Sequence, residues 1–292
     1  MDDYDAILIT GPTASGKSAL ALELAKQHGG AIINADSMQV YDTLRVLTAR
    51  PSEDEMEGVP HHLYGHVPAG SAYSAGDWVR QSAALIGRLR GEGVMPVIVG
   101  GTGLYFKALT GGLSDMPGIP EEIRDHLRRR LAEEGAEALH SELGIRDPDM
   151  AARLNPQDGQ RILRALEVLE VTGRSILSFQ GRTGPMIVDP AGARKIVVLP
   201  DRKVLHDRIN RRFEKMLDIG AVEEVEALLA LDLSPEMPVM KAIGVSQIAT
   251  MLMGDMTLAE VIEKASAATR QYAKRQMTWF RNQMDESWER IS

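Results

Sequence analysis

One loop near the start of the chain constrains the fold more than any other feature. Residues 11–18 fit the pattern G-x-x-x-x-G-K-[ST], after an apolar run at 6–10 and before a segment with helical spacing. In that context, backbone N–H groups and a helix N-terminus form a phosphate site. We predict that a phosphate group is bound by Gly11, Pro12, Thr13, Ala14, Ser15, Gly16, Lys17 and Ser18. Lys17 supplies a positive charge, and the Ser18 hydroxyl suits Mg²⁺ as a cofactor.

Short apolar runs rich in β-branched residues recur along the chain at 6–10, 31–34, 97–99 and 196–199. Segments with helical spacing lie between them. This alternation predicts the α/β class, with a parallel sheet of the P-loop NTPase kind and helices on both faces.

The strand signals stop between about residues 117 and 190, where helical spacing takes over. The apolar run at 196–199 then resumes the α/β pattern. We therefore predict a split core domain, 1–116 and 191–292, interrupted by a helical insertion domain at 117–190.

The chain contains no cysteine, which excludes disulfides, thiolate zinc sites, iron–sulfur clusters and a cysteine nucleophile. Its first residues are acidic where a secretory signal would be basic. The longest apolar runs are too short to span a bilayer. These features predict a cytoplasmic protein with no membrane partner.

The net charge of the whole chain is −8, which by itself argues against nucleic acid as a partner. The basic residues, however, are concentrated in two segments. Residues 151–215 carry a net +6 and residues 269–281 a net +4. In the second segment, helical geometry puts Arg270, Lys274 and Arg281 on one face, and Tyr272 and Trp279 on the opposite side. We predict a cationic face that contacts phosphates and an aromatic face that is buried.

An acid and a hydroxyl follow two of the predicted strands. Asp36 comes after the run at 31–34, whereas the run at 97–99 leads into glycines and Thr102 and lacks the acid typical of a nucleotide triphosphatase. Because ligands bind beyond the carboxyl ends of parallel strands, we expect the phosphate loop, Asp36 and Thr102 to share one crevice.

The chain resembles the bacterial tRNA dimethylallyltransferases, also called tRNA isopentenyltransferases. The resemblance spans nearly the whole chain and is carried by residues 11–18, 34–41, 48–51, 58–63, 99–105, 164–168, 242–244 and 269–276. The chain departs from the family pattern in a loop after Tyr41, at Asp42, Thr43, Arg45, Val46 and Leu47, and again at Val245.

The resemblance implies transfer of a dimethylallyl group from dimethylallyl diphosphate to N6 of the adenosine directly 3′ of the anticodon. This nucleoside lies at tRNA position 37, in tRNAs that read codons starting with U. Asp36, Thr102 and Lys17 are the implied catalytic residues, with Asp36 as the base. Arg208 is implied to join the loop in binding the diphosphate.

The resemblance also implies a set of contacts with the anticodon stem-loop of tRNA. The implied residues are Asp36, Ser37, Met38, Gln39, Thr102, Arg124, Gln160, Arg161, Ile162, Leu163 and Arg164. Among the last five, Gln160 and Arg164 share a helical face, whereas Ile162 and Leu163 point elsewhere. We expect a monomer, because an anticodon arm needs open surface.

Three other functions use the same features. An adenylate isopentenyltransferase would modify free nucleotide, but the insertion and the basic tail disfavour it. A small-molecule kinase would bind ATP in the loop, but the missing strand-end acid disfavours it. A non-catalytic, nucleotide-dependent RNA-binding protein would need no base and would therefore tolerate the loss of the Asp36 carboxylate.

Overall fold

The computed structural model describes residues 4–114, 116–180 and 184–292. The chain forms two compact units, one made of Met1–Thr110 with Ile187–Ser292 and the other of Gly111–Met186. The insertion predicted at 117–190 begins and ends a few residues later than the second unit does. Each unit is described by itself below.

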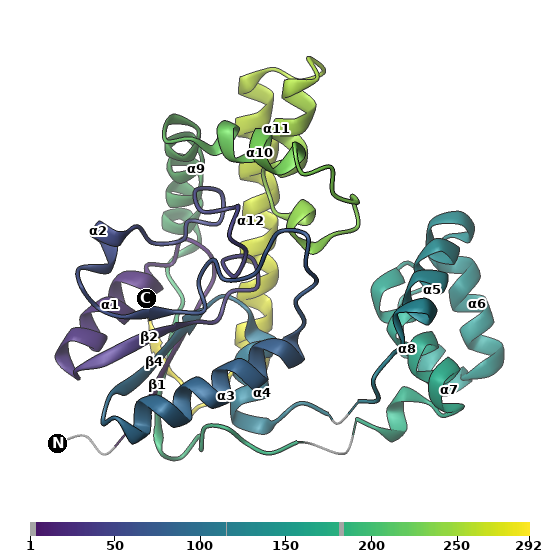
Figure 1. Cartoon of the computed structure of the whole chain (residues 1–292), viewed down its shortest axis with the longest axis horizontal. Coiled ribbons are helices and arrows are strands. Elements are labelled where there is room, and N and C mark those ends of the chain that lie inside the picture. Colours follow the sequence, from purple (N-terminus) through teal and green to yellow (C-terminus); the bar gives the residue numbers. More distant parts are fainter. Residues whose placement is uncertain (1–3, 115, 181–183) are drawn as a thin grey trace. The chain divides into compact units, whose positions relative to one another are not determined.

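The first unit, the core unit, is an α/β structure (Figure 1). Its strands are β1 (Ala6–Thr10), β2 (Gly30–Asn34), β3 (His61–His62), β4 (Met95–Gly100), β5 (Ala193–Val198) and β6 (Glu289–Ile291). Its helices are α1 (Lys17–Gln27), α2 (Glu53–Met56), α3 (Ala75–Gly91), α4 (Gly103–Gly111, which runs one residue past the boundary), α9 (Arg202–Asp218), α10 (Ala221–Leu229), α11 (Val245–Leu252) and α12 (Leu258–Gln283).

The six strands form one parallel sheet in the order β3-β2-β4-β1-β5-β6. This confirms the predicted parallel α/β sheet. β1 lies inside the sheet, where Ile7 pairs with Val97 of β4 and with Arg194 of β5. The sequence did not predict β3 and β6, because two and three residues are too few to show a strand period.

Alternate residues of the strands enter two separate apolar clusters, one on each face of the sheet. Ala6 and Leu8 pack with residues of α3, α4 and the end of α12. Ile7 and Ile9 pack with α1. Both faces are therefore covered by helices, as predicted, and every residue of β1 is buried.

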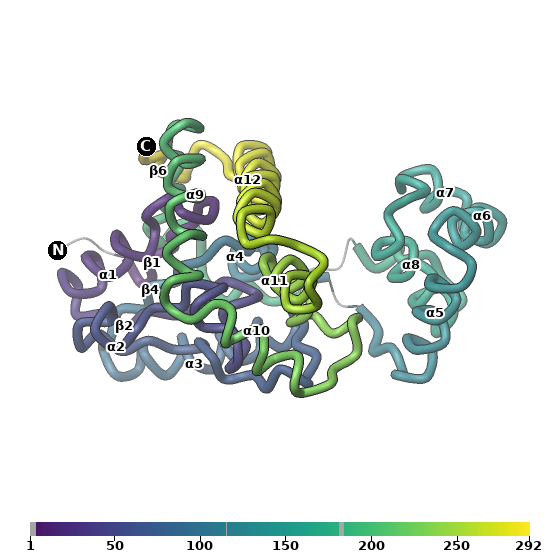
Figure 2. Tube along the Cα trace, turned by 90° about the horizontal axis from the view of Figure 1, so that it is seen from above, coloured from purple at the N-terminus to yellow at the C-terminus, as the bar shows by residue number. Residues whose placement is uncertain are grey.

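The C-terminal helices extend the core unit beyond the sheet. α9 and α12 lie side by side (Figure 2), joined by Leu205 and Ile209 of α9 and by Ala273 and Met277 of α12. A further cluster joins α10, α11 and the start of α12 to the chain around Val40. Gln276 of α12 bonds to Thr13 and Gly101, which places this helix beside the carboxyl ends of β1 and β4.

The second unit is helical, as the spacing predicted. It contains α5 (Glu121–Glu134), α6 (Ala136–Arg146), α7 (Pro148–Ala151) and α8 (Gly159–Thr172). Its core is built around Leu139, Leu143, Ile162 and Leu166. α8 ends at Gly173, whose φ of 65° is the left-handed conformation that favours glycine.

In the part of the chain that the structure describes, we find no helix with both the length and the apolar character needed to cross a membrane.

Candidate active site

The loop at 11–18 joins β1 to α1 and is shaped to surround an anion. A Cβ atom at Gly11 would lie 2.5 Å from the carbonyl oxygen of Val198, so the loop passes too close to β5 for any larger residue. α1 begins at Lys17 with no side chain capping its N-terminus. The Ser15 hydroxyl is buried and has no hydrogen-bond partner among the described residues. The loop therefore offers unpaired donors beside the positive end of a helix.

Lys17 lies inside this loop, where its ammonium donates to the carbonyl oxygen of Pro12 at 3.3 Å. Burial lowers the pKa of Lys17 to about 8, the nearby Asp36 carboxylate opposes that shift, and Arg212 adds to it. A cation that is buried without a strong partner gains most from an anionic ligand. Lys17 is therefore prepared for a phosphate group.

Asp36 follows β2 and is held in a tight turn. Its Oδ1 accepts from the backbone N–H of Met38 at 2.9 Å. The Asn34 side chain accepts from the Asp36 N–H at 2.9 Å and donates to the Asp36 carbonyl at 3.0 Å. These bonds fix the Asp36 backbone and engage one carboxylate oxygen, which leaves Oδ2 as an acceptor.

Thr102 follows β4 and bonds to the same turn. Its N–H donates to the carbonyl of Ala35 at 3.1 Å. Its hydroxyl oxygen accepts from the N–H of Ser37 at 3.0 Å. Because that oxygen is already an acceptor, its proton is available to donate to a ligand. The structure thus brings Thr102 and the Asp36 turn together, as expected for residues that follow the carboxyl ends of parallel strands.

Two arginines of α9 lie near the phosphate loop. Arg208 Nη1 donates to the carbonyl of Ser15 at 3.3 Å. Arg212, one helical turn later, acts electrostatically on both Lys17 and Asp36, and its burial lowers its own pKa. Sequence reasoning selected Arg208 and missed Arg212, although a spacing of four puts both on one helical face.

The loop at 42–50, whose residues 42–47 include the departures from the family pattern, is fixed by one carboxylate. Glu224 of α10 accepts from the N–H groups of Arg45, Val46 and Leu47, at 2.8, 2.6 and 3.1 Å. The same loop receives the amide of Gln39, which donates to the carbonyl groups at 48 and 49. Gln39 therefore keeps its amide oxygen as an acceptor at the edge of the site.

The prediction for the C-terminal helix α12 was wrong in part. Its buried stripe is formed by Ala273, Met277 and Phe280, whereas Tyr272 and Trp279 are only half-buried. The buried stripe therefore lies beside the cationic face and not opposite it. The buried side of α12 is the one whose small and apolar residues pack against α9 and the sheet.

The cations of α12 also differ in their contacts. Arg270 is half-buried and donates to Asn210 of α9 at 2.6 Å, so it is not part of an open stripe. Lys274 and Arg275 are exposed and line a groove of about 510 Å³ along the helix, together with Trp279. This groove combines two cations with an indole ring.

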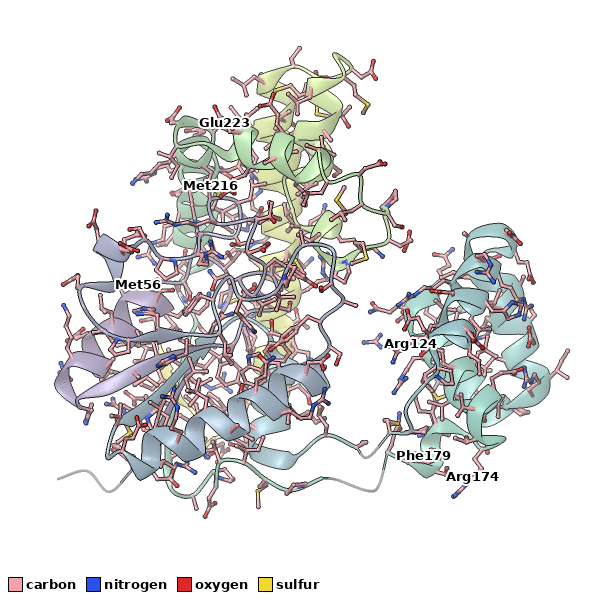
Figure 3. All side chains as sticks on the ribbon, in the orientation of Figure 1. Met56, Arg124, Arg174, Phe179, Met216 and Glu223 are labelled. Atoms are coloured by element: carbon pink, nitrogen blue, oxygen red, sulfur yellow. The ribbon has the colours of Figure 1, made fainter. Side chains whose placement is uncertain are left out.

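The predicted tRNA-binding residues of the insertion lie in the second unit, where Figure 3 labels Arg124 on α5. The arginines pair with acids three positions away: Arg124 with Glu121 at 3.5 Å, Arg161 with Asp158 at 2.7 Å, and Arg164 with Glu167 at 3.2 Å. Gln160 is exposed.

Two residues of the predicted tRNA-binding segment face the interior of the second unit. Ile162 is fully buried in its core, as expected from helical spacing, which pointed this side chain away from Gln160 and Arg164. Leu163 is half-buried against the same core. α8 needs these residues to pack against α5 and α6.

Among the described residues, no group of three or more histidines and acids converges to hold a metal ion. The loop nevertheless fits Mg²⁺, because this ion prefers oxygen ligands and commonly completes its shell with substrate phosphates and water. The Ser18 hydroxyl, in the first turn of α1, is the oxygen that this chain offers there.

Comparisons with known proteins identify the relatives of this chain. A profile of the family described as "IPP transferase" matches residues 39–283, and one described as "Isopentenyl transferase" matches residues 4–64. The tRNA dimethylallyltransferase of Rhizobium johnstonii is 73% identical over 292 residues, which is 100% of this chain and 98% of that protein. The protein of the same name from Agrobacterium fabrum is 72% identical over 99% of this chain and 97% of its own length.

Solved structures give the same result. A tRNA isopentenylpyrophosphate transferase from Bacillus halodurans superposes with a TM-score of 0.69 and 34% identity, over 98% of this chain and 89% of that one. A eukaryotic dimethylallyltransferase described as acting on tRNA has a TM-score of 0.80 and 28% identity, over 94% of this chain and 69% of its own.

Proposed function

The chain belongs to the IPP transferase family, and from this premise we propose that it transfers a dimethylallyl group from dimethylallyl diphosphate to N6 of a tRNA adenosine. The acceptor is adenosine 37, directly 3′ of the anticodon, in tRNAs that read codons starting with U. The observation that carries the proposal is the convergence of a phosphate loop, a carboxylate and a free hydroxyl proton at one edge of the sheet.

The reaction forms a bond between N6 of adenine and C1 of the dimethylallyl group, and breaks the bond from C1 to the diphosphate oxygen. The adenine amine is a weak nucleophile because its lone pair is delocalised into the ring. A base must take its proton as the new bond forms, and Asp36 Oδ2 is the acceptor placed for this. Thr102 donates its free hydroxyl proton to the substrate beside the reacting carbon.

The departing diphosphate takes up negative charge in the transition state. Lys17, the loop N–H groups and the N-terminus of α1 surround the position of that charge, and Arg208 reaches the loop from α9. Bound Mg²⁺, held by Ser18 and by diphosphate oxygens, would neutralise part of the same charge. A loop of the kind that usually binds ATP thereby binds the diphosphate leaving group.

The acceptor adenine has to leave its stack to reach this edge of the sheet, which costs least in a loop such as the anticodon loop. We infer that residues 36–39 contact the extruded base. Arg124, Gln160, Arg161 and Arg164 of the second unit, and the cationic groove of α12, contact the RNA backbone. The protein works as a monomer in the cytoplasm on this proposal.

Transfer of radiolabel from dimethylallyl diphosphate with Mg²⁺ tests the function. The acceptors are an unmodified tRNA with three adenosines after the anticodon and, in parallel reactions, AMP and ATP. Label in the tRNA alone supports the proposal. Label in AMP or ATP alone overturns it in favour of a free-nucleotide prenyltransferase. If folded protein transfers no label to any acceptor, the proposal is also overturned, and a kinase that binds ATP in the loop is favoured.

A further inference from the structure

The buried amide of Gln276 connects two parts of the site that the sheet does not connect. Its Oε1 accepts from the N–H of Thr13 in the phosphate loop at 2.9 Å. Its Nε2 donates to the carbonyl of Gly101, also at 2.9 Å. Among the hydrogen bonds of the described residues, no other side chain bonds to both segments.

These two segments leave the sheet at neighbouring points, and beyond those points no strand pairing joins them. The pairing of β1 with β4 ends at Thr10 and Gly100, and the Thr10 hydroxyl adds one bond to the Gly100 carbonyl at 3.0 Å. Beyond that point, the phosphate loop turns toward α1 and the other chain turns into Thr102 and α4. The Gln276 amide spans the gap that opens between them.

A neutral amide is the side chain that suits this position. It has a donor and an acceptor on one rigid plane, so it pairs with an N–H and a C=O at once. A carboxylate would pair only with Thr13, and an ammonium only with Gly101. The exposed fraction of Gln276 is 7%, so it contacts the protein and not the solvent.

α12 fixes the position of this amide firmly. Ala273 and Met277, on either side of it, pack with Leu205 and Ile209 of α9. On the other side, a Cβ atom at Gly101 would lie 2.4 Å from Gln276 Nε2. A side chain at position 101 would therefore displace the amide from its place between the two segments.

We propose that Gln276 is a positioning residue that sets the spacing between the phosphate loop and the Gly101–Thr102 turn. This inference rests on the proposed function, in which the loop holds the diphosphate and the turn holds Thr102 beside Asp36. The distance between the leaving group and the base is then controlled by a residue 240 positions away from Asp36 in the sequence. On this proposal Gln276 acts through the backbone of Thr13 and Gly101.

Each half of the site has its own internal bonds. The loop retains the bond from the Ser15 N–H to the Pro12 carbonyl, and the turn retains the bond from Thr102 to the Ala35 carbonyl. Loss of the amide should therefore leave each half able to bind its own substrate. Only the geometry between the halves should change, and a misplacement of about 1 Å can cost about 100-fold in rate.

The first test is Gln276→Met, which keeps the length of the side chain and removes both hydrogen bonds. The transfer assay gives kcat, calorimetry gives the Kd of inorganic diphosphate, and filter binding gives the Kd of tRNA. We expect kcat to fall by about 100-fold while both Kd values stay within about threefold. Gln27→Met, at an exposed glutamine of α1, is the matched control and should behave as wild type.

A merely structural role would lower the melting temperature and leave kcat of the folded variant near wild type, which overturns the proposal. A diphosphate Kd that rises as much as kcat falls also overturns it, because Gln276 would then serve the loop alone. Wild-type protein that transfers no label in the same assay refutes the proposed function itself and not this inference in particular.

A double-mutant cycle covers the case in which Gln276→Met does not fold. Gly101→Ala should push the amide away and reduce kcat by about 100-fold. In a Gln276→Ala background, the space is free and Gly101→Ala should cost less than about threefold more. Equal losses from Gly101→Ala in both backgrounds would show that the glycine is needed for another reason and would reject the inference.

Discussion

The polar residues of the core unit and those of the insertion are held in different ways. In the core unit, Thr102, Gln276 and Arg208 bond to backbone atoms of segments 65 or more residues away in the sequence. In the insertion, each predicted tRNA-binding arginine pairs with an acid three residues away on its own helix or turn.

This difference corresponds to two different tasks. Backbone atoms fixed by a sheet hold a reacting group in one place, as bond formation requires. The pairs of Arg124 and Arg161 are exposed, and pairs at this spacing contribute only about 0.2–0.5 kcal/mol, so these two arginines can exchange their acids for an RNA phosphate at little cost. Arg164 differs from them, because its partner Glu167 is buried. The first arrangement holds reacting groups in fixed positions, and the second provides positive charges that can bind an RNA phosphate.

The largest expected effect concerns the acceptor of the proton. Asp36→Asn keeps an oxygen for the Met38 N–H but removes the base, so kcat should fall by about 1000-fold while the Kd of tRNA changes by less than about threefold. Single-turnover transfer and filter binding measure the two quantities. Unchanged turnover would mean that Asp36 only shapes the turn, as in a non-catalytic RNA-binding protein.

The next effect concerns pH. Because the pKa of Lys17 in the free protein is about 8, the ammonium is present at pH 7 and largely lost at pH 9. An anion binds the protonated form, so the Kd of dimethylallyl diphosphate without tRNA should rise about tenfold between pH 7 and pH 9. Calorimetry across this range measures it.

Lys17→Arg is the control for this pH dependence, since arginine does not titrate there. Its Kd should be nearly flat between pH 7 and pH 9, whatever its absolute value. A wild-type curve as flat as that of the variant would show that Lys17 is not the titrating group.

A smaller effect should come from the insertion. Arg164→Ala should weaken tRNA binding by about fivefold and reduce its salt dependence, without changing the Kd of inorganic diphosphate. Arg161→Ala is a second variant whose acid partner is more exposed. Arg146→Ala, which removes an arginine paired with Glu142 and Glu170 in the same unit, is the matched control for charge. Equal tRNA affinity in the Arg164 and Arg146 variants would contradict a direct contact.

The smallest effect should come from Glu224→Gln. An amide cannot accept from three backbone N–H groups as a carboxylate does, so the loop at 42–50 should loosen. We expect a melting temperature lower by about 2–4 °C and a KM for tRNA higher by about twofold, through Gln39. Glu223→Gln, at the exposed neighbour labelled in Figure 3, should change neither. A stable variant with normal KM would show that the loop needs no such support.

The sequence predicted the parts of this molecule that depend on local patterns. The phosphate loop was found because a short motif, a buried strand and a helix start lie together between residues 6 and 27. The proximity of Asp36 and Thr102 was predicted because the carboxyl ends of parallel strands lie at one edge of the sheet. The helical insertion was found from the loss of strand signals.

The parts that sequence reasoning missed depend on contacts between distant segments. Gln276 looks like any polar helical residue until its bonds to Thr13 and Gly101 are seen. Helical angles gave no information on which side of α12 would meet α9, and so Trp279 was assigned to a buried face and Arg270, which bonds to Asn210 of α9, to an open cationic face.

The position of β1 in the sheet has a consequence for synthesis on the ribosome. β1 emerges first, but one of its neighbours, β4, begins at Met95, and the other, β5, at Ala193. Helices of the insertion need only local contacts and emerge before β5, so they should be complete while β1 still lacks its second neighbour in the sheet. The first strand to be translated is therefore among the last to be enclosed, and the nascent chain should hold an open apolar edge until nearly two-thirds of the protein has been made.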